Sequence, residues 1–418
     1  MKMKMKTLLI VTAALVGLSQ QVSAAGFYVG EQSAIANGMG LAVTAKLMDP
    51  GTISFNPAGM AFLPGLHVSA GILMAVPVFK FSDPNGIDPS MTASKNPNWI
   101  PHVYATYTFL NNKLSFGLGF NVPYGLVVAW PKGFSGGAYS QKVDLKIMHM
   151  YFGVAWRFAK HWSIGAVFKA APSSAMFEQD YQVGTDSGKL ATMSAKVSGS
   201  GWGFGGGIGI MGEPFKGFHL GVSYTSRMKL SLNGDAHFDL PSDFHDFSVF
   251  HDQGGGATMW IPDIIAVGLG YDITKDVYIE FDFNYTLWSV YNELPVTFDN
   301  DPSGQLSSVS KKNWKNTPTF RLAASWNVIP ALTLRLGGGY DISPVPDSTL
   351  DPMLPDANRF FASFGIGYNI KKIGLRFDLS YSFVKFMQRT VTAADSNPFP
   401  ATYNGMAHLV GLTVGYAL

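Results

Sequence analysis

The feature that most constrains the fold of this chain is a regular alternation of apolar and polar residues. In the segment 277–287, Val, Ile, Phe, Phe, Tyr and Leu occupy the odd positions, and Tyr, Glu, Asp, Asn and Thr occupy the even ones. The segment 373–383 repeats the pattern, with Arg376 and Asp378 on its polar face, where they can pair. Because successive side chains of a strand point to opposite sides, each segment predicts a strand with one apolar and one polar face.

A soluble β-sandwich would alternate in the same way, so composition has to decide between the two environments. Only 14% of the residues are charged, whereas about 25% is typical of soluble proteins. After residue 24, no stretch reaches the roughly 18 uninterrupted apolar residues that a membrane-spanning helix needs. Hydrocarbon tolerates only helices and closed barrels, because unpaired backbone groups are costly there. The sequence therefore predicts an all-β transmembrane barrel whose apolar faces contact membrane lipid.

The first residues indicate export. Lys2, Lys4 and Lys6 precede an apolar run at 8–18, and small residues follow at Val22-Ser23-Ala24. This order is typical of a signal peptide, and the run is too short for a membrane anchor. We expect residues 1–24 to be removed. Loss of the three lysines changes the formal charge of +2 to about −1, which does not favour nucleic acid as a partner. The chain has no cysteine, which excludes disulfides and thiol chemistry.

Between residues 66 and 418 the alternation predicts about fourteen antiparallel strands, each long enough for a tilted crossing. Short turns alternate with long connections, expected near 82–98, 126–142, 179–191, 237–256, 296–307, 343–358 and 387–405. This arrangement is typical of an outer-membrane barrel whose two ends lie in the periplasm. The predicted strands begin near Leu66, Trp99, Lys113, Val143, Trp162, Thr192, Phe218, Ala257, Lys275, Ser308, Leu332, Arg359, Ile373 and Met406.

Residues 25–65 do not alternate. They contain many small residues, including Gly38, Gly40, Gly51 and Gly59, and too many apolar residues for a disordered tail. We interpret this segment as a hatch, meaning a plug folded inside the barrel lumen. The predicted organisation is thus a signal peptide (1–24), a hatch (25–65) and a barrel (66–418).

Several short motifs then stand in an informative order. They are Ala25-Gly26-Phe27, Asn56-Pro57-Ala58, Ser343-Pro344-Val345-Pro346, Pro355-Asp356-Ala357-Asn358-Arg359-Phe360 and the final Tyr416-Ala417-Leu418. In this order, the chain resembles the long-chain fatty acid transporter (FadL) family of outer-membrane proteins, which includes aromatic hydrocarbon transporters. The resemblance implies a monomeric barrel in the outer membrane of a Gram-negative-type bacterium. Its final apolar stripe resembles the signal read by the barrel assembly machinery, although Leu418 replaces the usual aromatic residue.

The resemblance also implies a route for hydrophobic molecules. Ligand would be captured by outer loops, held in a pocket over the hatch and released sideways into membrane lipid at a kinked third strand. That strand contains Pro123, which cannot donate a hydrogen bond to a neighbouring strand, although Pro123 could also simply end the strand. The gate candidates are Asn121, Pro123 and Gly125, with Asn56, Pro57 and Ala58 as their partner on the hatch.

The candidate ligand-binding residues are Phe27, Tyr124, Leu126, Trp130, Phe134, Lys315 and Arg321. Leu126, Trp130 and Phe134 belong to an unusually apolar outer connection, which could be a landing patch, a lid packed over the barrel mouth, or both. By resemblance, Lys315 would contact a ligand carboxylate. The family's arginine partner has no counterpart, because Ser173, Ser174 and Ala175 stand there, so neutral aromatic hydrocarbons are an alternative ligand.

Charged residues on the polar faces favour structural ion pairs within the lumen over ligand binding. The expected inward residues are Arg227, Arg321, Arg335, Arg359 and Arg376, with Glu280, Asp282, Asp341 and Asp378. No Ser/His/Asp grouping, metal-ligand spacing or cofactor motif stands out, so we predict no catalytic residue, metal or cofactor. An outer-membrane enzyme, an open porin and a loop-based adhesin are the alternatives from other classes.

Overall fold

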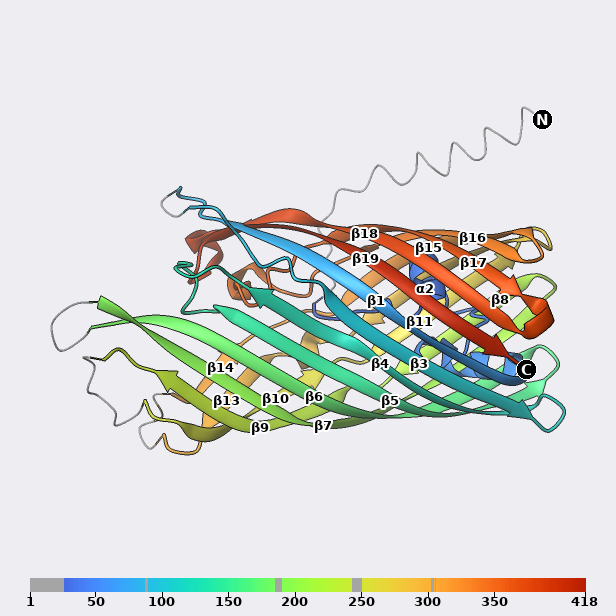
Figure 1. Cartoon of the computed structure of the whole chain (residues 1–418), viewed down its shortest axis with the longest axis horizontal. Helices are drawn as coiled ribbons and strands as arrows, with labels where there is room; N and C mark the ends of the chain where they lie inside the picture. The colour runs from blue at the N-terminus through green and yellow to red at the C-terminus, as the bar shows by residue number, and fades with distance from the viewer. Residues whose placement is uncertain (1–25, 87–88, 185–189, 243–249, 302–303, 305) are drawn as a thin grey trace, which may run out of the picture.

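The computed structural model describes residues 26–86, 89–184, 190–242, 250–301, 304 and 306–418. The predicted signal peptide lies outside these residues. The strands form one antiparallel sheet, which closes into a barrel because β1 (Gly65–Ser82) pairs with both β3 (Asn98–Phe109) and β19 (Ala401–Ala417) (Figure 1). In the part of the chain described here, no helix is long and apolar enough to cross a membrane.

The described residues form fourteen crossings of the barrel, which confirms the predicted number. Four crossings are interrupted, and each consists of two consecutive short strands: β8 with β9, β10 with β11, β12 with β13, and β14 with β15. The remaining strands are β2 (Met91–Thr92), β4 (Leu114–Ala129), β5 (Lys142–Ala159), β6 (Trp162–Gly184), β7 (Leu190–Phe215), β8 (Phe218–Thr225), β9 (Met228–Asp239), β10 (Gln253–Ile261), β11 (Ile264–Asp272), β12 (Val277–Thr286), β13 (Glu293–Phe298), β14 (Ser308–Lys311), β15 (Thr317–Ile329), β16 (Leu332–Asp341), β17 (Arg359–Ile370) and β18 (Leu375–Val391).

The helices are short. They are α2 (Ala34–Gly38), α3 (Thr52–Phe55), η1 (Pro57–Phe62), η2 (Trp288–Val290), η3 (Asp347–Thr349), η4 (Lys371–Ile373) and η5 (Ala393–Asp395). The short turns lie at the end of the barrel that carries the C-terminus, here called the turn end, and the longer connections lie at the opposite, loop end (Figure 1). In an outer-membrane barrel the loop end faces outside.

Several strands reach further toward the loop end than predicted. The connection expected at 179–191 is largely strand, because β6 continues to Gly184 and β7 begins at Leu190. β10 begins at Gln253 and β19 at Ala401, four and five residues before the predicted starts. Beyond the hydrocarbon layer the outer face of a strand does not need to be apolar, so the alternation that reveals the strand fades there.

The two faces of the wall follow the predicted alternation. Phe281 and Leu379 point outward, with 41% and 49% of their surfaces exposed, whereas Glu280, Asp282 and Asp378 point inward and are buried. Asp378 pairs with Arg335 and Arg376, and Asp341 pairs with Arg359. The predicted inward position of Arg227 is wrong. Its side chain is 55% exposed and pairs with Asp263. The prediction failed because Arg227 lies in the break between β8 and β9, where the alternation of inward and outward residues is interrupted.

Residues 26–64, here called the N-terminal segment, lie inside the barrel. α2 contacts β16 to β19, whereas η1 contacts strands from β3 to β7 on another part of the wall. Backbone approaches backbone closely at two points: a Cβ atom on Gly40 would collide with Gly338, and one on Gly165 would collide with Pro57. Only glycine permits such approaches.

Inward-facing polar side chains hold this segment through its backbone. Asp282 accepts hydrogen bonds from the Val43 and Thr44 N–H groups, both at 3.0 Å, and Glu280 accepts one from the Ala45 N–H at 2.6 Å. A buried segment with little helix or strand has many backbone groups that need partners. The polar face of the wall supplies these partners.

The segment also contains a buried acid, Asp49, whose Oδ1 accepts a hydrogen bond from the Gly51 N–H at 2.8 Å. Burial raises the pKa of Asp49 from 3.8 to about 6. Since the folded pKa lies above the unfolded one, the protonated form favours folding. This contribution is complete below pH 3.8 and is lost as the pH rises through about 6.

We therefore expect local stability around Asp49 to fall by up to about 3 kcal/mol between pH 4 and pH 7, since the shift is about two pKa units. Hydrogen exchange of residues 49–55, corrected for intrinsic rates, measures this fall. Asp49→Asn should remove most of the pH dependence. Equal pH profiles in the two proteins would contradict the assignment.

Candidate functional site

The wall of the barrel is open between β3 and β4. Their pairing runs from Phe109↔Leu114 to Val103↔Phe120 and stops there. Residues 98–102 of β3 still pair with β1 but have no partner on β4. The register between β4 and β5 shifts between Asn121 and Tyr124, where β4 has one extra residue. The break expected at Pro123 is therefore present, and it leaves a lateral gap in the loop-end half of the wall.

The N-terminal segment occupies the inner side of this gap. The Val29 N–H donates to the Pro123 carbonyl at 2.8 Å, and the Gly125 N–H donates to the Phe27 carbonyl at 3.1 Å. Gln32 bonds to both the N–H and the carbonyl of Val122, at 3.1 and 3.0 Å. Residues 27–32 thus satisfy backbone groups of β4 that have no partner on β3.

The predicted hatch-side partner of the kink is therefore wrong. Asn56, Pro57 and Ala58 lie against β6 and β7: the Asn56 amide donates to the Ile210 carbonyl at 3.1 Å, and Ser163 donates to the Ala58 carbonyl at 2.8 Å. Asn56 also caps η1, since its side chain accepts a hydrogen bond from the Ala58 N–H. The triplet fixes the position of η1 and does not contact β4 at Pro123.

Asn121 belongs to a polar chain beside the kink. Its amide donates to the Tyr104 hydroxyl at 2.9 Å, and its carbonyl oxygen accepts from the Tyr151 hydroxyl at 3.0 Å. The Tyr104 hydroxyl in turn donates to the Gln32 carbonyl at 3.0 Å. The side chain of Asn121 thus connects β4 to the same N-terminal residues that contact its kink.

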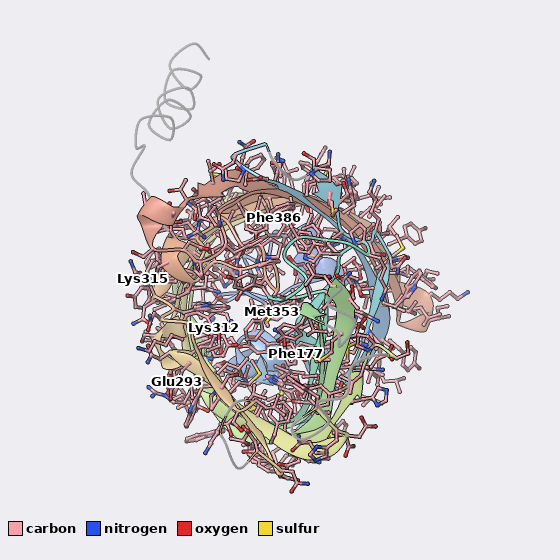
Figure 2. All side chains as sticks on the ribbon, turned by 90° about the vertical axis from the view of Figure 1, so that its left-hand side faces the viewer. Phe177, Glu293, Lys312, Lys315, Met353 and Phe386 are labelled. Carbon is pink, nitrogen blue, oxygen red and sulfur yellow. The ribbon has the colours of Figure 1, made fainter. Side chains whose placement is uncertain are left out.

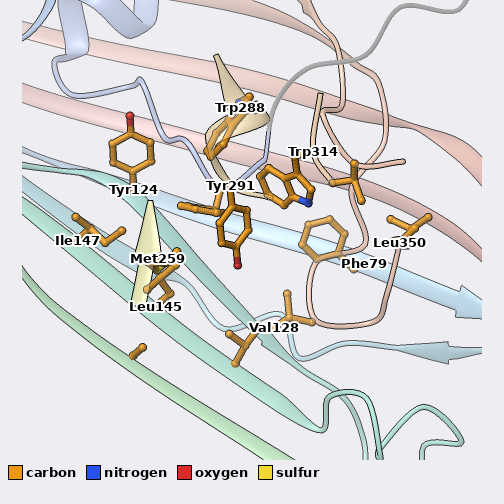
Figure 3. Packing of buried hydrophobic residues seen from close by; sticks show 14 of the residues in the cluster. Phe79, Tyr124, Val128, Leu145, Ile147, Met259, Trp288, Tyr291, Trp314 and Leu350 are labelled. Atoms are coloured by element: carbon orange, nitrogen blue, oxygen red, sulfur yellow. The ribbon is translucent and has the colours of Figure 1, made fainter. Parts of the chain in front are cut away.

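Phe27 lies in an aromatic cage. Its ring centroid is 5.1 Å from that of Trp288, 5.7 Å from Trp314, 5.9 Å from Tyr291 and 6.0 Å from Tyr124. Figure 3 shows Trp288, Tyr291 and Trp314 close together, with Tyr124 to their left. The structure therefore brings together Phe27 and Tyr124, two of the predicted ligand residues. Sequence reasoning missed the other three, which lie where crossings are interrupted between β12 and β13 and between β14 and β15.

A series of cavities leads from the loop end to the gap. An outer cavity of about 620 Å³ is lined by apolar residues such as Phe177, Met193, Phe238 and Phe298. An inner chamber of about 350 Å³ lies at the gap. Both volumes are in the range of sites for small organic ligands. The lining residues of the chamber include Phe27, Trp99, Ile100, Leu126, Val127 and Phe386.

A small cavity of about 30 Å³, here called the neck, lies between the two spaces. It shares Phe177, Lys312 and Met353 with the outer cavity, and it shares Phe27 and Leu126 with the inner chamber. Figure 2, viewed from the loop end, shows Phe177, Lys312 and Met353 within the barrel outline. The route through these spaces is mainly apolar, and Phe27 stands between the neck and the chamber.

The apolar connection after β4 packs over the barrel mouth. Trp130 and Phe134 are buried, their rings stack at 4.6 Å, and the Trp130 indole donates to the Pro352 carbonyl at 3.0 Å. Of the two interpretations of this segment, the structure has the packed lid. Neither Trp130 nor Phe134 is exposed in this structure, so a role of this segment in capture stays a prediction. Leu126 differs from Trp130 and Phe134, since it belongs to β4 and lines the neck and the chamber.

The predicted cations do not reach the route. Lys315 is exposed, and its backbone N–H donates to the Pro344 carbonyl at 2.9 Å. Arg321 is buried opposite Asp282 but lines neither the outer cavity, the neck nor the chamber. Other cations line these spaces: Lys312, paired with Asp351 at 3.0 Å, lines the outer cavity and the neck, and Lys146 and Arg359 line the chamber. In the described part of the chain, no group of three or more His, Cys, Asp or Glu residues could hold a metal ion.

The fold and the site define a class: an outer-membrane β-barrel whose lumen holds its own N-terminal segment and whose wall is open beside an apolar chamber. The chain belongs to the outer membrane protein transport protein family (OMPP1/FadL/TodX), whose family model matches residues 15–418.

Known relatives span nearly the whole chain. The long-chain fatty acid transport protein of Escherichia coli (strain K12) is 26% identical over 457 residues, which cover 99% of this chain and 98% of the relative. The crystal structure of a Pseudomonas aeruginosa FadL homologue superposes with a TM-score of 0.81 at 18% identity, covering 94% of this chain and 100% of that one. For the Pseudomonas putida toluene transporter TodX, the TM-score is 0.73 at 16% identity, with coverage of 95% and 99%. The structural likenesses establish the fold.

Replacement of Phe27 by alanine tests whether this ring separates the neck from the chamber. We expect Phe27→Ala to increase the association rate of the hydrophobic dye 1-N-phenylnaphthylamine severalfold, measured by stopped-flow fluorescence. Loss of a packed Phe should also destabilise the N-terminal segment by about 3–5 kcal/mol. Phe281→Ala, on the outer face, is the control and should leave the rate unchanged. An unchanged rate in Phe27→Ala would contradict the role.

Proposed function

We propose that this protein takes up hydrophobic molecules across the outer membrane and that long-chain fatty acids are the first class to test. The observation that carries the proposal is the row of mainly apolar cavities with shared lining residues, which begins under the loops and ends at the gap between β3 and β4. The family supports it, because relatives named for fatty acid transport match the chain along almost its full length.

The physical reason for such a route is that exposing an acyl chain to water is unfavourable in free energy. Each CH₂ group gains about 0.8 kcal/mol on leaving water, so a water-filled pore is a poor path for a long chain. An apolar cavity can accept the chain at the loop end. An opening in the wall can then release it into membrane lipid without a further passage through water.

In this proposal, the N-terminal segment acts as the hatch. It fills the lumen below the chamber, so a ligand that reaches the chamber meets folded protein on the periplasmic side and the lateral gap on the other. The gate consists of residues 122–125 together with residues 27–32, which hydrogen-bond to them. The boundaries 1–24, 25–65 and 66–418 belong to the same proposal, as do a monomeric state and delivery by the barrel assembly machinery.

Neutral aromatic hydrocarbons are the second candidate class. One observation favours them: Lys312, the lysine on the wall of the outer cavity and the neck, already has Asp351 as its counter-ion. A toluene transporter is also among the proteins that share the fold. Competition between a fatty acid and toluene for the purified protein would rank the two classes.

Deletion of Pro123 tests lateral release. Because β4 has one extra residue between Asn121 and Tyr124, the deletion should restore its register with β5 and straighten the strand. We expect uptake of a fluorescent fatty acid by expressing cells to fall at least tenfold while heat-modifiable gel mobility and binding of the probe by the purified protein are retained.

Pro318→Val is the matched control, since Pro318 lies in a regularly paired part of β15. Its uptake should equal that of the unaltered protein. Undiminished uptake by the folded Pro123 deletion would refute lateral release and would leave ligand binding as a separate question.

A further inference from the structure

We propose that Glu31 couples occupation of the chamber to the uptake of a proton, unless the ligand itself donates a hydrogen bond to this carboxylate. A ligand without a donor then binds the protonated protein, whereas an alcohol or a phenol binds the charged form equally well. The inference rests on the proposed function. It adds to that function a residue that discriminates between two classes of hydrophobic ligand.

Glu31 lies on the wall of the chamber beside the gap. It belongs to residues 27–32, which bond to the kinked part of β4. Its side chain is half-buried. The chamber around it is mainly apolar, with lining residues such as Phe79, Ile100 and Phe386. A ligand that fills this space therefore meets the carboxylate directly.

Among the charged residues of the chamber wall, Glu31 is the one without a close counter-ion. The two cations of the wall have acids of their own. Lys146 pairs with Asp144 at 3.0 Å. Arg359 pairs with Asp341 at 2.9 Å. In the described part of the chain, no cation lies within salt-bridge distance of the Glu31 carboxylate, and no other residue donates a hydrogen bond to it. Its charge therefore depends on water that enters the chamber.

The surroundings of Glu31 already favour its protonated form. Burial raises the pKa of Glu31 above its ordinary value of 4.5. The charged groups that face it from the wall act in both directions: Arg359 on β17 and Arg321 on β15 lower this pKa, and Asp341 on β16 raises it. The other titratable residues on the chamber wall carry neither a carboxyl nor an imidazole group; they are Tyr28, Lys146 and Arg359. Proton uptake below neutral pH is therefore assigned to Glu31.

Ligand binding removes the water on which the charge of Glu31 depends. A carboxylate that loses water without gaining a partner is strongly disfavoured, so it takes up a proton instead. The pKa of Glu31 is therefore higher in the complex with a hydrocarbon than in the free protein. By linkage, the affinity for the hydrocarbon is greatest below the pKa of the free protein. It falls as the pH rises toward the pKa of the complex, by up to about tenfold per pH unit.

A hydroxyl group on the ligand changes this balance. Its O–H donates to the Glu31 carboxylate, and a hydrogen bond to a charged acceptor is stronger than a neutral one. The charged form of Glu31 then keeps a partner when water leaves, so no proton is required. The same residue thus separates hydroxylated ligands from purely apolar ones near neutral pH. An acyl chain that fills the chamber acts as a hydrocarbon in this respect.

The test uses the full mature chain in detergent with naphthalene and 2-naphthylmethanol, two ligands that do not titrate between pH 5 and pH 8. Because the chain has no cysteine, Ile100→Cys places one reactive thiol on the chamber wall. Protection of this thiol from methyl methanethiosulfonate, compared with and without ligand at each pH, measures occupation of the chamber. From pH 5 to pH 8 we expect naphthalene to lose at least about tenfold in affinity and naphthylmethanol to change by less than about twofold.

Glu31→Gln removes the titrating group from the same Ile100→Cys background. A neutral amide needs no proton, so naphthalene should bind as tightly at pH 8 as at pH 5. Proton uptake, measured by calorimetry in buffers of different ionisation enthalpy, should largely disappear. Glu293→Gln is the matched control and should keep the pH dependence, since Glu293 is exposed and lines none of the three cavities. A merely structural role predicts instead that Glu31→Gln weakens both ligands at every pH.

The outcomes separate the two levels of the proposal. If naphthalene protects the thiol equally well at pH 5 and pH 8, or if Glu31→Gln leaves its pH dependence unchanged, the coupling is wrong and the proposed uptake of hydrophobic molecules stands. If neither ligand protects the thiol at any pH and neither binds the purified protein, the proposed function itself fails. The comparison of the two ligands in Ile100→Cys remains decisive even if Glu31→Gln does not fold.

Discussion

The structure depends on one constraint: hydrocarbon offers no hydrogen-bonding partner to a peptide group. A sheet in that medium must close, and the pairing of β1 with β19 closes it. The same constraint leaves the inward face free to be polar. Here that face does more than line a lumen, because Asp282 and Glu280 act as acceptors for the backbone of the N-terminal segment. The barrel wall and the N-terminal segment therefore satisfy each other's buried hydrogen-bonding groups.

Where the wall departs from regular pairing, the features of the candidate site appear. The extra residue of β4 takes this strand away from β3, and residues 27–32 occupy the inner side of the opening. Interruptions of two other crossings turn Trp288, Tyr291 and Trp314 inward around Phe27. The chamber lies between these two irregularities, lined by Phe27 and by residues of the gap. Departures from strand geometry thus border the chamber on both sides.

The sequence was sufficient to predict the strands of the barrel wall. It was insufficient to predict which residues line the cavities inside the barrel. Alternation predicted the number of strands and the inward position of Asp378 because both follow from a period of two. Pro123 predicted the break because it lacks an N–H. The period is lost wherever a crossing is interrupted, however. For this reason Arg227 was placed on the wrong face. Lys315 was assigned by resemblance, and its side chain is exposed and lines none of the three cavities. The contact of residues 27–32 with the kink in β4 could not be predicted, because the N-terminal segment has no regular alternation of apolar and polar residues.

The way in which the sheet closes also determines when the N-terminal segment is enclosed. The seam of the barrel joins its first and last strands, and the N-terminal segment directly precedes the first. At its start, the Gly26 N–H already donates to Asp356 inside the loop end, while the final residue lies at the turn end. The lumen around the segment is closed only when β1 and β19 are paired, so formation of the seam and enclosure of the segment are the same event.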